Sequence, residues 1–427
     1  MKYLKEAAPR PTRELADGDV RQAVERIILD VLERGDAAVR EYSEQFDGWS
    51  PRSFCLSADE IERCVASLRG DYRSAIEFTL QQVTGFARAQ KNTLLDLEVE
   101  SMPGVTLGHK HIPVHSVGCY VPGGRYPMLA SAIMSVSTAK VAGVPRVVAC
   151  TPPFGGKPYA ISVATMALAG ADEIYILGGV QAVALMALGT ATFEPVDMIV
   201  GPGNAYVTEA KRQLFGHVGI DLLAGPTEVL VIADETADAE MVATDLLGQA
   251  EHGESSPATL VTTSESLGWA VLSEIERQVP LLATGPIAAA AWRDFGSVLV
   301  VDSVDAAIAE ADRLAAEHVE VLTADSSVFL ERLTNYGSLF LGPETNVAFG
   351  DKAIGTNHIL PTQGAARFTG GLWVGKFLKT VTYQRCTPAA SVVVAENCAT
   401  ICEIEGFAAH KAQADLRLRR YRQEVTR

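Results

Sequence analysis

Two polar side chains that could bind a metal ion lie three residues apart in the stretch DLLGQAEHG. Gln249 and His252 would leave one face of a helix, a geometry in which two side chains can reach one ion. Histidine is the commonest metal ligand in proteins, whereas glutamine is rare in that role. The pair also fits a helix that simply ends in polar residues, so it is a weak signal by itself.

Candidate acid–base groups lie in LAAEHVEVLT, where a helical pattern gives way to a strand pattern. Glu317 and His318 stand at that junction, and parallel-sheet proteins build sites at the ends of strands. Because adjacent residues point to different sides, we expect these two to act in two separate proton transfers rather than as one dyad. A histidine that only complements the dipole of a helix C-terminus is the structural alternative.

Further candidates lie nearer the C-terminus and in glycine turns. Asp351 and His358 in GDKAIGTNHILPT offer a carboxylate and an imidazole, and Glu405 and His410 lie five residues apart in EGFAAHK. The turns YVPGG and GPGNAY each follow a strand pattern and open a helix, so their N–H groups could hold a pyrophosphate. Neither turn matches the dinucleotide fingerprint, because Tyr206 occupies the third glycine position of the second turn.

The elements that would position these residues alternate between strand and helix. From about residue 105 to 323, short apolar runs and glycine turns alternate with helical patterns, which predicts parallel sheets covered on both faces. We expect an α/β protein with two tandem Rossmann-like parallel-sheet domains and helical N-terminal and C-terminal extensions. The expected boundaries are an extension over 1–20, a first domain with the metal and acid–base residues over 21–118 plus 227–370, a second domain with the glycine turns over 119–226, and a tail over 371–427.

Composition narrows the partners of the chain. Its 427 residues carry a net charge of -16, which disfavours nucleic acid and anionic membranes. The first residues lack the apolar core of a secretory signal, and no apolar run is long enough to span a membrane. The seven cysteines are scattered and odd in number, which fits reduced thiols. We therefore expect a cytoplasmic protein that acts on a small molecule.

Several short motifs, in a fixed order, resemble those of a known family. They span about residues 20 to 412 and read GCYVPGG, GPGNAYVTEAKRQ, AGPTEVLVIAD, LLGQAEHG, AEHVEVLT, GSLFLG, GTNHILPT and EGFAAHK. Together they resemble the histidinol dehydrogenases, which use zinc and NAD to oxidise a primary alcohol to a carboxylate in two hydride transfers. The resemblance implies an intertwined homodimer with one zinc ion per subunit.

The resemblance also implies roles for the residues that match the family motifs. The zinc ligands would be Gln249, His252, Asp351 and His410. The partner subunit of the dimer would supply His410 and also Glu405. His318 would be the general base that acts on the alcohol, and Glu317 would activate water for the second oxidation. The NAD contacts would be Tyr120, Gln181 and Asn204. The substrate site would be lined by Thr227, His318, His358 and Glu405.

Three positions depart from the family pattern. Val347 stands where the family usually has a glutamate, four residues before the zinc aspartate. Thr227 replaces a serine and Lys376 an aspartate, and Arg125 lies beside the first glycine turn. One negative charge fewer and two positive charges favour an anionic substrate. The matching branch of the family oxidises (R)-2,3-dihydroxypropane-1-sulfonate to sulfolactate, which we favour here; oxidation of L-histidinol is the alternative.

Two hypotheses without turnover stay open. One is a zinc- and nucleotide-binding protein that catalyses nothing, which the joint presence of the catalytic pair and all four presumed ligands disfavours. The other is a structural dimer whose glycine turns only pack, and stoichiometric zinc would argue against it.

Overall fold

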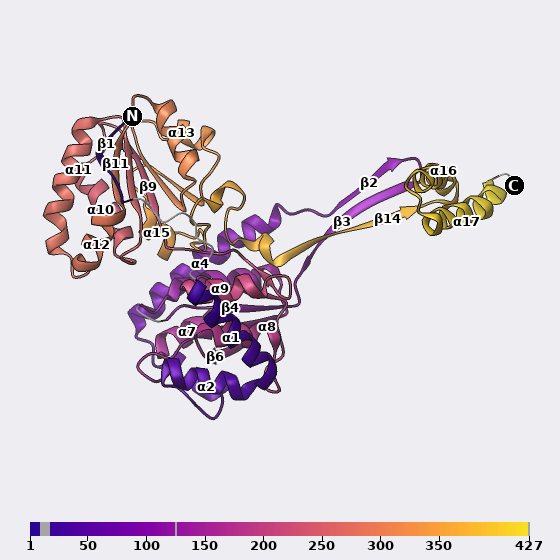
Figure 1. Cartoon of the computed structure of the whole chain (residues 1–427), viewed down its shortest axis with the longest axis horizontal. Coiled ribbons are helices and arrows are strands. Elements are labelled where there is room, and N and C mark those ends of the chain that lie inside the picture. The colour runs from indigo at the N-terminus through magenta and orange to yellow at the C-terminus, as the bar shows by residue number, and fades with distance from the viewer. Residues whose placement is uncertain (9–17, 124–125, 426–427) are drawn as a thin grey trace.

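Two parallel sheets covered by helices form the body of this computed structural model, which confirms the α/β prediction. The structure describes residues 1–8, 18–123 and 126–425. Figure 1 shows the two sheets in separate layers, with α4 (Gly70–Asn92) between them and a long arm that carries the C-terminus away from both. No helix in these three ranges is both long and apolar enough to cross a membrane.

The five-stranded sheet is wholly parallel and has the order β6-β5-β4-β7-β8. Its strands are β4 (Ser116–Tyr120), β5 (Arg146–Thr151), β6 (Glu173–Ile176), β7 (Met198–Val200) and β8 (Gly219–Ile220). The segments between them form α5 (Leu129–Ala132), η1 (Ile133–Ser137), α6 (Thr138–Ala142), α7 (Ala160–Ala169), α8 (Gly179–Leu188) and α9 (Ala205–Leu214). Every residue of β4 is buried, because helices cover both faces of the sheet and exclude water.

The six-stranded sheet has the order β1-β11-β10-β9-β12-β13, and only β1 runs antiparallel to its neighbour. Its strands are β1 (Lys2–Lys5), β9 (Val229–Ala233), β10 (Ala258–Thr262), β11 (Gly296–Val300), β12 (His318–Leu322) and β13 (Ser338–Leu341). Its helices are α10 (Ala239–Ala250), α11 (Glu265–Gln278), η2 (Val279–Leu281), α12 (Gly285–Phe295), α13 (Val304–Leu314), α14 (Ser327–Arg332) and α15 (Val347–Lys352). Two short helices follow, η3 (Ala365–Arg367) and η4 (Val374–Phe377).

The N-terminal helices do not cover the sheet with which the sequence boundaries grouped them. Residues 21–118 were expected beside 227–370, but α1 (Gly18–Arg34) packs against α8 and α9 of the five-stranded sheet. Likewise α2 (Asp36–Asp47) packs against α8, and α3 (Ala58–Ala66) against α7. An amphipathic pattern shows that a helix has an apolar face but does not specify which sheet that face covers.

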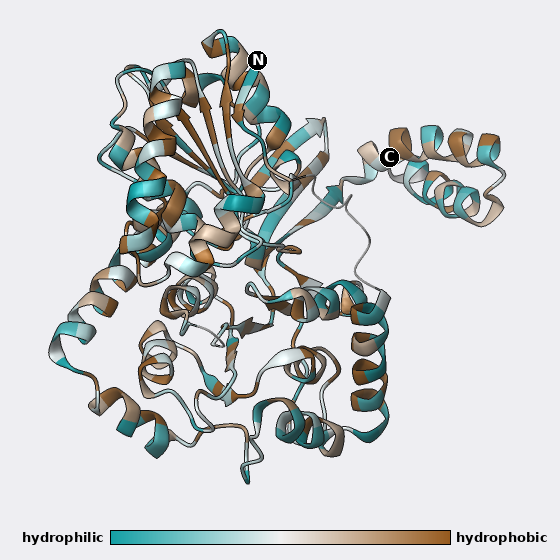
Figure 2. Ribbon diagram, turned by 60° about the vertical axis from the view of Figure 1, so that its left-hand side comes forward, coloured by the Kyte–Doolittle hydropathy of each residue, from teal (hydrophilic) through white to brown (hydrophobic). Residues whose placement is uncertain are grey.

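The arm is the largest feature that the sequence analysis did not predict. An antiparallel sheet of β2 (Leu97–Met102), β3 (Val105–Pro113) and β14 (Leu378–Cys386) leads to a hairpin of α16 (Pro388–Glu405) and α17 (Ala408–Val425). The two helices pack on each other, apart from both sheets (Figure 1). Figure 2 shows apolar stretches on this hairpin, where large side chains such as Ile401, Ile404 and Phe407 are exposed. A single chain therefore leaves an apolar surface at the end of the arm uncovered.

Opposite edges of the two sheets face each other. In the five-stranded sheet β4 lies between β5 and β7, and in the six-stranded sheet β9 lies between β10 and β12. The glycine turns follow β4 and β7 at the carboxyl edge of one sheet, whereas Thr227 and Glu317 precede β9 and β12 at the amino edge of the other. A hydrogen bond of 3.1 Å from Asn357 Nδ2 to the carbonyl of Met134 helps hold the two edges together.

Candidate functional site

Six of the residues singled out in the sequence lie together between the two sheet edges. We call them the buried cluster: Thr227, Gln249, Glu317, His318, Asp351 and His358. All except Thr227 are less than one tenth exposed. They come from the turns before β9 and β12, from the first residue of β12, from α10, from α15 and from the segment after α15. The cluster lies at the amino ends of β9 and β12, because Thr227 and Glu317 come just before these strands in the chain.

A chain of hydrogen bonds joins a presumed metal ligand to a presumed base. Gln249 Nε2 donates to Thr227 Oγ1. The Thr227 hydroxyl in turn donates to Glu317 Oε2, 2.6 Å away. Since its NH₂ group is committed to Thr227, the amide of Gln249 turns its Oε1 atom the other way. That oxygen is buried and accepts no hydrogen bond from any described residue.

His318 is held in one tautomer by its surroundings. Its Nδ1 lies 3.0 Å from the carbonyl oxygen of Glu228, which can only accept, so Nδ1 carries a proton. Its Nε2 faces Asp351, 3.3 Å from Oδ1. Burial alone would lower the pKa of His318, but the carboxylates of Glu317 and Asp351 outweigh burial and raise it to about 9. The nitrogen able to exchange a proton with a substrate is therefore Nε2.

Glu317 and His318 lie closer together than their adjacency in the sequence suggested. Glu317 Oε2 is 3.6 Å from His318 Nδ1, because Glu317 stands in the turn before β12 and does not follow the alternation of a strand. Burial raises the pKa of Glu317 to about 7, against the opposing effects of His318 and Thr227. A carboxyl group with such a pKa can accept or release a proton near neutral pH.

The donor set fits a divalent metal ion that needs one more ligand. Burial by itself would raise the pKa of Asp351, but His318 and His358 outweigh burial and lower that pKa to about 2. Asp351 is therefore an anionic oxygen donor. His252 lies in the turn after α10, and burial lowers its pKa, so it offers a neutral imidazole. With the unpaired oxygen of Gln249 these make three donors. One of these three donors is an amide; within the described ranges, no three or more His, Cys, Asp or Glu side chains form a group that could hold a metal ion by themselves.

Sequence analysis missed Ser131, which holds His358. His358 Nδ1 lies 3.0 Å from the carbonyl of Asp351, so that nitrogen donates, and Nε2 accepts from the hydroxyl of Ser131 at 2.8 Å. Burial lowers the pKa of His358 to about 4, which keeps the ring neutral. Ser131 lies in α5, just after the first glycine turn. Its place at the start of a helix that follows a strand was the only feature of the sequence that could have pointed to a role in the site.

The residues matched to NAD contacts lie around the carboxyl edge of the five-stranded sheet. Tyr120 ends β4, and its hydroxyl accepts the N–H of Gly179 at the start of α8. Gln181 is buried in α8, and its Oε1 has no hydrogen-bond partner within 1–8, 18–123 and 126–425. Asn204 caps α9 through Oδ1, which accepts from two backbone N–H groups. Gly124 of the first turn lies outside the described residues.

Glu405 and His410 are not part of the buried cluster in this chain. Glu405 ends α16 and His410 lies in the first turn of α17, so both are at the far end of the arm and exposed (Figure 1). The ring of His410 lies against that of Phe407, with 5.4 Å between the two centroids. A single chain therefore does not bring the predicted fourth metal ligand to the other three.

The positions that depart from the family pattern have different surroundings. Val347 is 7% exposed and packs in the apolar core of the six-stranded sheet. Lys376 lies in η4, at the foot of the arm, and Arg125 lies outside the described residues. Thr227 differs, because its hydroxyl forms two of the hydrogen bonds of the buried cluster.

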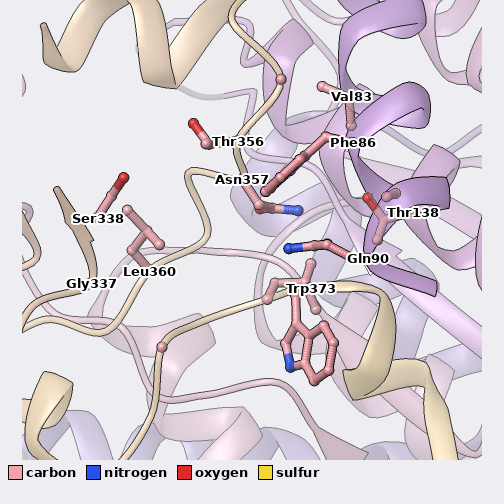
Figure 3. A pocket seen from close by; sticks show the side chains of 14 residues that line it. Val83, Phe86, Gln90, Thr138, Gly337, Ser338, Thr356, Asn357, Leu360 and Trp373 are labelled. Carbon is pink, nitrogen blue, oxygen red and sulfur yellow. The ribbon is translucent and has the colours of Figure 1, made fainter. Parts of the chain in front are cut away.

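A pocket of about 140 Å³ lies beside the buried cluster, between α4 and the segment after α15. In Figure 3 the amide side chains of Asn357 and Gln90 approach each other above Trp373. Asn357 immediately precedes His358, but no side chain predicted for zinc, NAD or catalysis lines this pocket. The pocket is therefore separate from the candidate site.

Comparisons with known proteins agree with the motifs. The family model described as histidinol dehydrogenase matches residues 10–418. A histidinol dehydrogenase homolog of Shouchella clausii is 59% identical, over 98% of this chain and 99% of its own length. The sulfopropanediol 3-dehydrogenase of Ruegeria pomeroyi is 46% identical, over 99% and 97%. The crystal structure of histidinol dehydrogenase from Elizabethkingia anophelis has a TM-score of 0.91 and 34% identity, covering 96% of this chain and 94% of that one.

Proposed function

Because this chain belongs to the histidinol dehydrogenase family, whose members are NAD-dependent oxidoreductases acting on CH–OH groups, we propose that it oxidises a primary alcohol to a carboxylate. The alcohol, two NAD⁺ and one water give the carboxylate, two NADH and three protons. The aldehyde formed by the first hydride transfer stays bound for the second. The observation that carries this proposal is the hydrogen-bond chain from Gln249 through Thr227 to Glu317, beside His318.

In the first oxidation, Nε2 of His318 takes the hydroxyl proton while the carbon gives its hydride to NAD⁺. The Nδ1–H donated to the carbonyl of Glu228 keeps the ring in the tautomer with Nε2 free. Without a metal the two carboxylates would keep His318 protonated. A cation at Asp351 offsets the charge of one of them, so metal binding favours the neutral, basic form of His318.

In the second oxidation, Glu317 removes a proton from the water that adds to the aldehyde. Its pKa near 7 makes the carboxylate a competent base at neutral pH and the carboxylic acid a competent donor. The hydrate then loses its second hydride to a second NAD⁺. Since Oε2 of Glu317 accepts from Thr227 and from the N–H of Glu228, Oε1 is the atom left for the water.

Zinc is the metal that we assign to this site. Gln249, His252 and Asp351 would bind it, with His410 of the partner subunit as the fourth ligand. When bound, zinc acts as a Lewis acid that polarises and orients the substrate oxygen. The unpaired Oε1 of Gln249 and the low pKa of Asp351 support this assignment.

NAD would bind at the carboxyl edge of the five-stranded sheet, where β4 lies next to β7. Ligands of open parallel sheets bind where the strand order reverses, and the turns after β4 and β7 stand at that point. Tyr120 keeps its hydroxyl proton for an acceptor, and Gln181 offers an unpaired Oε1. Asn204 supports the start of α9, whose N–H groups favour a pyrophosphate.

We further propose (R)-2,3-dihydroxypropane-1-sulfonate as the substrate and sulfolactate as the product. The 46% identity to a sulfopropanediol 3-dehydrogenase supports this choice, as does the apolar Val347 in place of a carboxylate. L-Histidinol remains the alternative, because the more similar protein from Shouchella clausii is described only as a histidinol dehydrogenase homolog.

The functional unit would be an intertwined homodimer in which each arm reaches the other subunit's site. Glu405 of the partner subunit would then line the substrate site, next to the fourth zinc ligand. The exposed apolar side chains on the arm helices support burial against a second copy of the chain.

A side-by-side assay of NAD⁺ reduction by the zinc-loaded protein tests this function. With (R)-2,3-dihydroxypropane-1-sulfonate we expect two NADH per substrate consumed and no aldehyde that a carbonyl reagent can trap. We expect a lower kcat/KM with L-histidinol. One NADH together with free aldehyde would contradict the two-step reaction, and a preference for L-histidinol would replace the substrate while leaving the reaction intact.

A further inference from the structure

One cation at the edge of the buried cluster has no role in the proposed chemistry. Lys352 ends α15, directly after Asp351, and its Nζ lies 3.9 Å from Oδ2 of that carboxylate. Its side chain is 53% exposed. No hydrogen bond leads from Nζ to another residue in the part of the chain that the structure describes. The three N–H donors of this ammonium group are therefore available to a ligand.

The contact with Asp351 does not account for the position of this lysine. At 3.9 Å the two groups share no hydrogen bond, and the ammonium faces water. Such exposed ion pairs contribute little to stability, because water and salt screen them. If zinc takes the charge of Asp351, the attraction between the two residues weakens further.

The main chain at Lys352 is fixed so that its charge stays near the cluster. The carbonyl of Lys352 accepts the hydroxyl of Thr79 in α4 at 3.1 Å, and the carbonyl of Asp351 accepts Nδ1–H of His358 at 3.0 Å. Burial is the largest influence on the pKa of His252 and of His358 and lowers both, and Asp351 opposes it. Lys352 is the third influence and also lowers both pKa values. Its ammonium thus lies within electrostatic range of a presumed zinc ligand and of a presumed substrate residue.

The charges that one chain places around the cluster suit a substrate that is negative at one end. Glu317 and Asp351 are already engaged by hydrogen bonds or ion pairs within the cluster. His358 is neutral, and Val347 adds no charge at the start of α15. An amine on the substrate would meet Lys352 as a like charge, whereas an anion would meet free N–H donors.

We propose that Lys352 binds the anionic group of the substrate, in this case the sulfonate of (R)-2,3-dihydroxypropane-1-sulfonate. This inference rests on the proposed function, since it assumes that the alcohol is oxidised in the buried cluster. Sulfonate, phosphate and carboxylate share the same attraction to an ammonium group. Lys352 therefore sets the preference for an anion, and the shape of the site sets which anion fits.

The test compares wild type with Lys352→Gln, Lys352→Arg and the charge-matched control Lys157→Gln. Lys157 lies exposed in the loop between β5 and α7. The substrates are the sulfonate, sn-glycerol 3-phosphate and uncharged propane-1,2-diol. For the sulfonate we expect Lys352→Gln to raise KM about tenfold or more, the usual size of a lost charge-assisted hydrogen bond. We expect its kcat to stay within about twofold, and Lys352→Arg and Lys157→Gln to keep the wild-type KM.

Several results would overturn the assignment. An unchanged KM for the sulfonate in Lys352→Gln would do so. An equal rise in KM for propane-1,2-diol, or a loss of bound zinc, would also do so, because either would show a general effect on the site. If wild type does not oxidise the sulfonate at all, the proposed substrate fails rather than Lys352. A faster, Lys352-dependent oxidation of sn-glycerol 3-phosphate would support the lysine and replace the sulfonate.

Discussion

The amide of Gln249 can present only one of its two polar ends to a metal, and Thr227 determines which. By accepting a hydrogen bond from Nε2, Thr227 leaves Oε1 unpaired, and oxygen is the end that binds a cation. By donating to Glu317, the same hydroxyl stabilises the carboxylate that we propose as a base. Thr227, which sequence matched only to substrate binding, therefore positions both a proposed metal ligand and a proposed base.

Replacing Thr227 should disturb both neighbours in measurable ways. Thr227→Val keeps the shape but removes the hydroxyl, so the amide of Gln249 loses its anchor and Glu317 loses a donor. Unsatisfied buried groups cost about 1–3 kcal/mol, so we expect roughly tenfold weaker zinc binding in competition with a chelator. Burial raises the pKa of Glu317 and Thr227 opposes it, so the acid limb of the kcat profile should move to higher pH. Thr227→Ser should restore both, and an unchanged profile in Thr227→Val would contradict this role.

The individual residues of the site could be predicted from sequence, but their mutual arrangement could not. Motifs identified Gln249, Glu317 and Asp351 because the chemistry requires those side-chain types. Which atom of Gln249 points to the metal depends on a hydrogen bond to Thr227, 22 residues away. Ser131 and Lys352 were missed because a lone serine or lysine gives no signal until the fold brings it near His358 or Asp351.

At the scale of elements, α10 and β12 each contribute side chains both to the buried cluster and to a second group beneath it. Gln249 and Asp245 lie one turn apart on α10, and His318 and Glu320 lie two residues apart on β12, so each pair shares a face. Beneath the buried cluster, Asp245 and Glu320 thus form a second, carboxyl layer. Glu320 is 0% exposed, and its carboxyl group faces that of Asp245. Burial, and then the charge of Asp245, raise the pKa of Glu320.

This layer should make stability depend on pH. The pKa of Glu320 is higher in the folded protein than in the unfolded chain, so the folded state favours the protonated carboxyl group. This contribution to stability is fully present below the ordinary pKa of a carboxyl group, and it is lost as the pH rises through the pKa of the folded state. Glu320→Gln resembles the protonated form at every pH. We expect its melting temperature to exceed that of wild type at pH 8 and the difference to shrink towards pH 5. Glu331→Gln, at an exposed position in α14, should show no such trend, and a pH-independent difference in Glu320→Gln would contradict the argument.

The strands and helices of both sheets followed from local patterns, but their partners did not. Continuous apolar runs such as VVAC and VLVIA predicted buried parallel strands, and β5 and β9 confirm them. The extended pairing of β3 with β14 escaped prediction, since 264 residues separate the ends of these two strands and neither has a continuous apolar run. Pairing across such a distance depends on tertiary structure rather than on local sequence.

At the scale of the whole molecule, the candidate site depends on two sheets meeting by opposite edges. The carboxyl edge of one sheet provides the glycine turns, and the amino edge of the other provides Thr227, Glu317 and His318. The hydrogen bond from Ser131 to His358 crosses between them. A hydride donor and its acceptor must lie close together, and this arrangement brings the proposed cofactor and substrate sites to one interface.

We propose that the arm extends this dependence to a second chain. One chain offers Gln249, His252 and Asp351 as proposed zinc ligands, and the fourth proposed ligand, His410, lies on the arm. His410 is exposed at the end of the arm, where it cannot reach its own cluster (Figure 1). If the arm completes the site of the partner, then each active site takes His318 from one subunit and His410 from the other.

Subunit mixing tests this arrangement directly. His318→Asn should lower turnover by roughly 10²–10⁴-fold through loss of the base, and His410→Ala should do so through loss of zinc. After the two inactive variants are unfolded together in equal amounts and refolded, half of the dimers are mixed, and each mixed dimer holds one site with both histidines. We therefore expect about a quarter of wild-type activity, while the total bound zinc stays the same as in the two variants kept apart, because each intact His410 still serves one site.

The controls decide what such a recovery means. Each variant refolded alone should stay inactive, because every site then lacks the same histidine. If His410 served the site of its own chain, a mixed dimer would contain one site without His318 and one without His410, and no activity would return. An inactive mixture in which mixed dimers are shown to form would therefore place the fourth ligand elsewhere and contradict the exchange of arms.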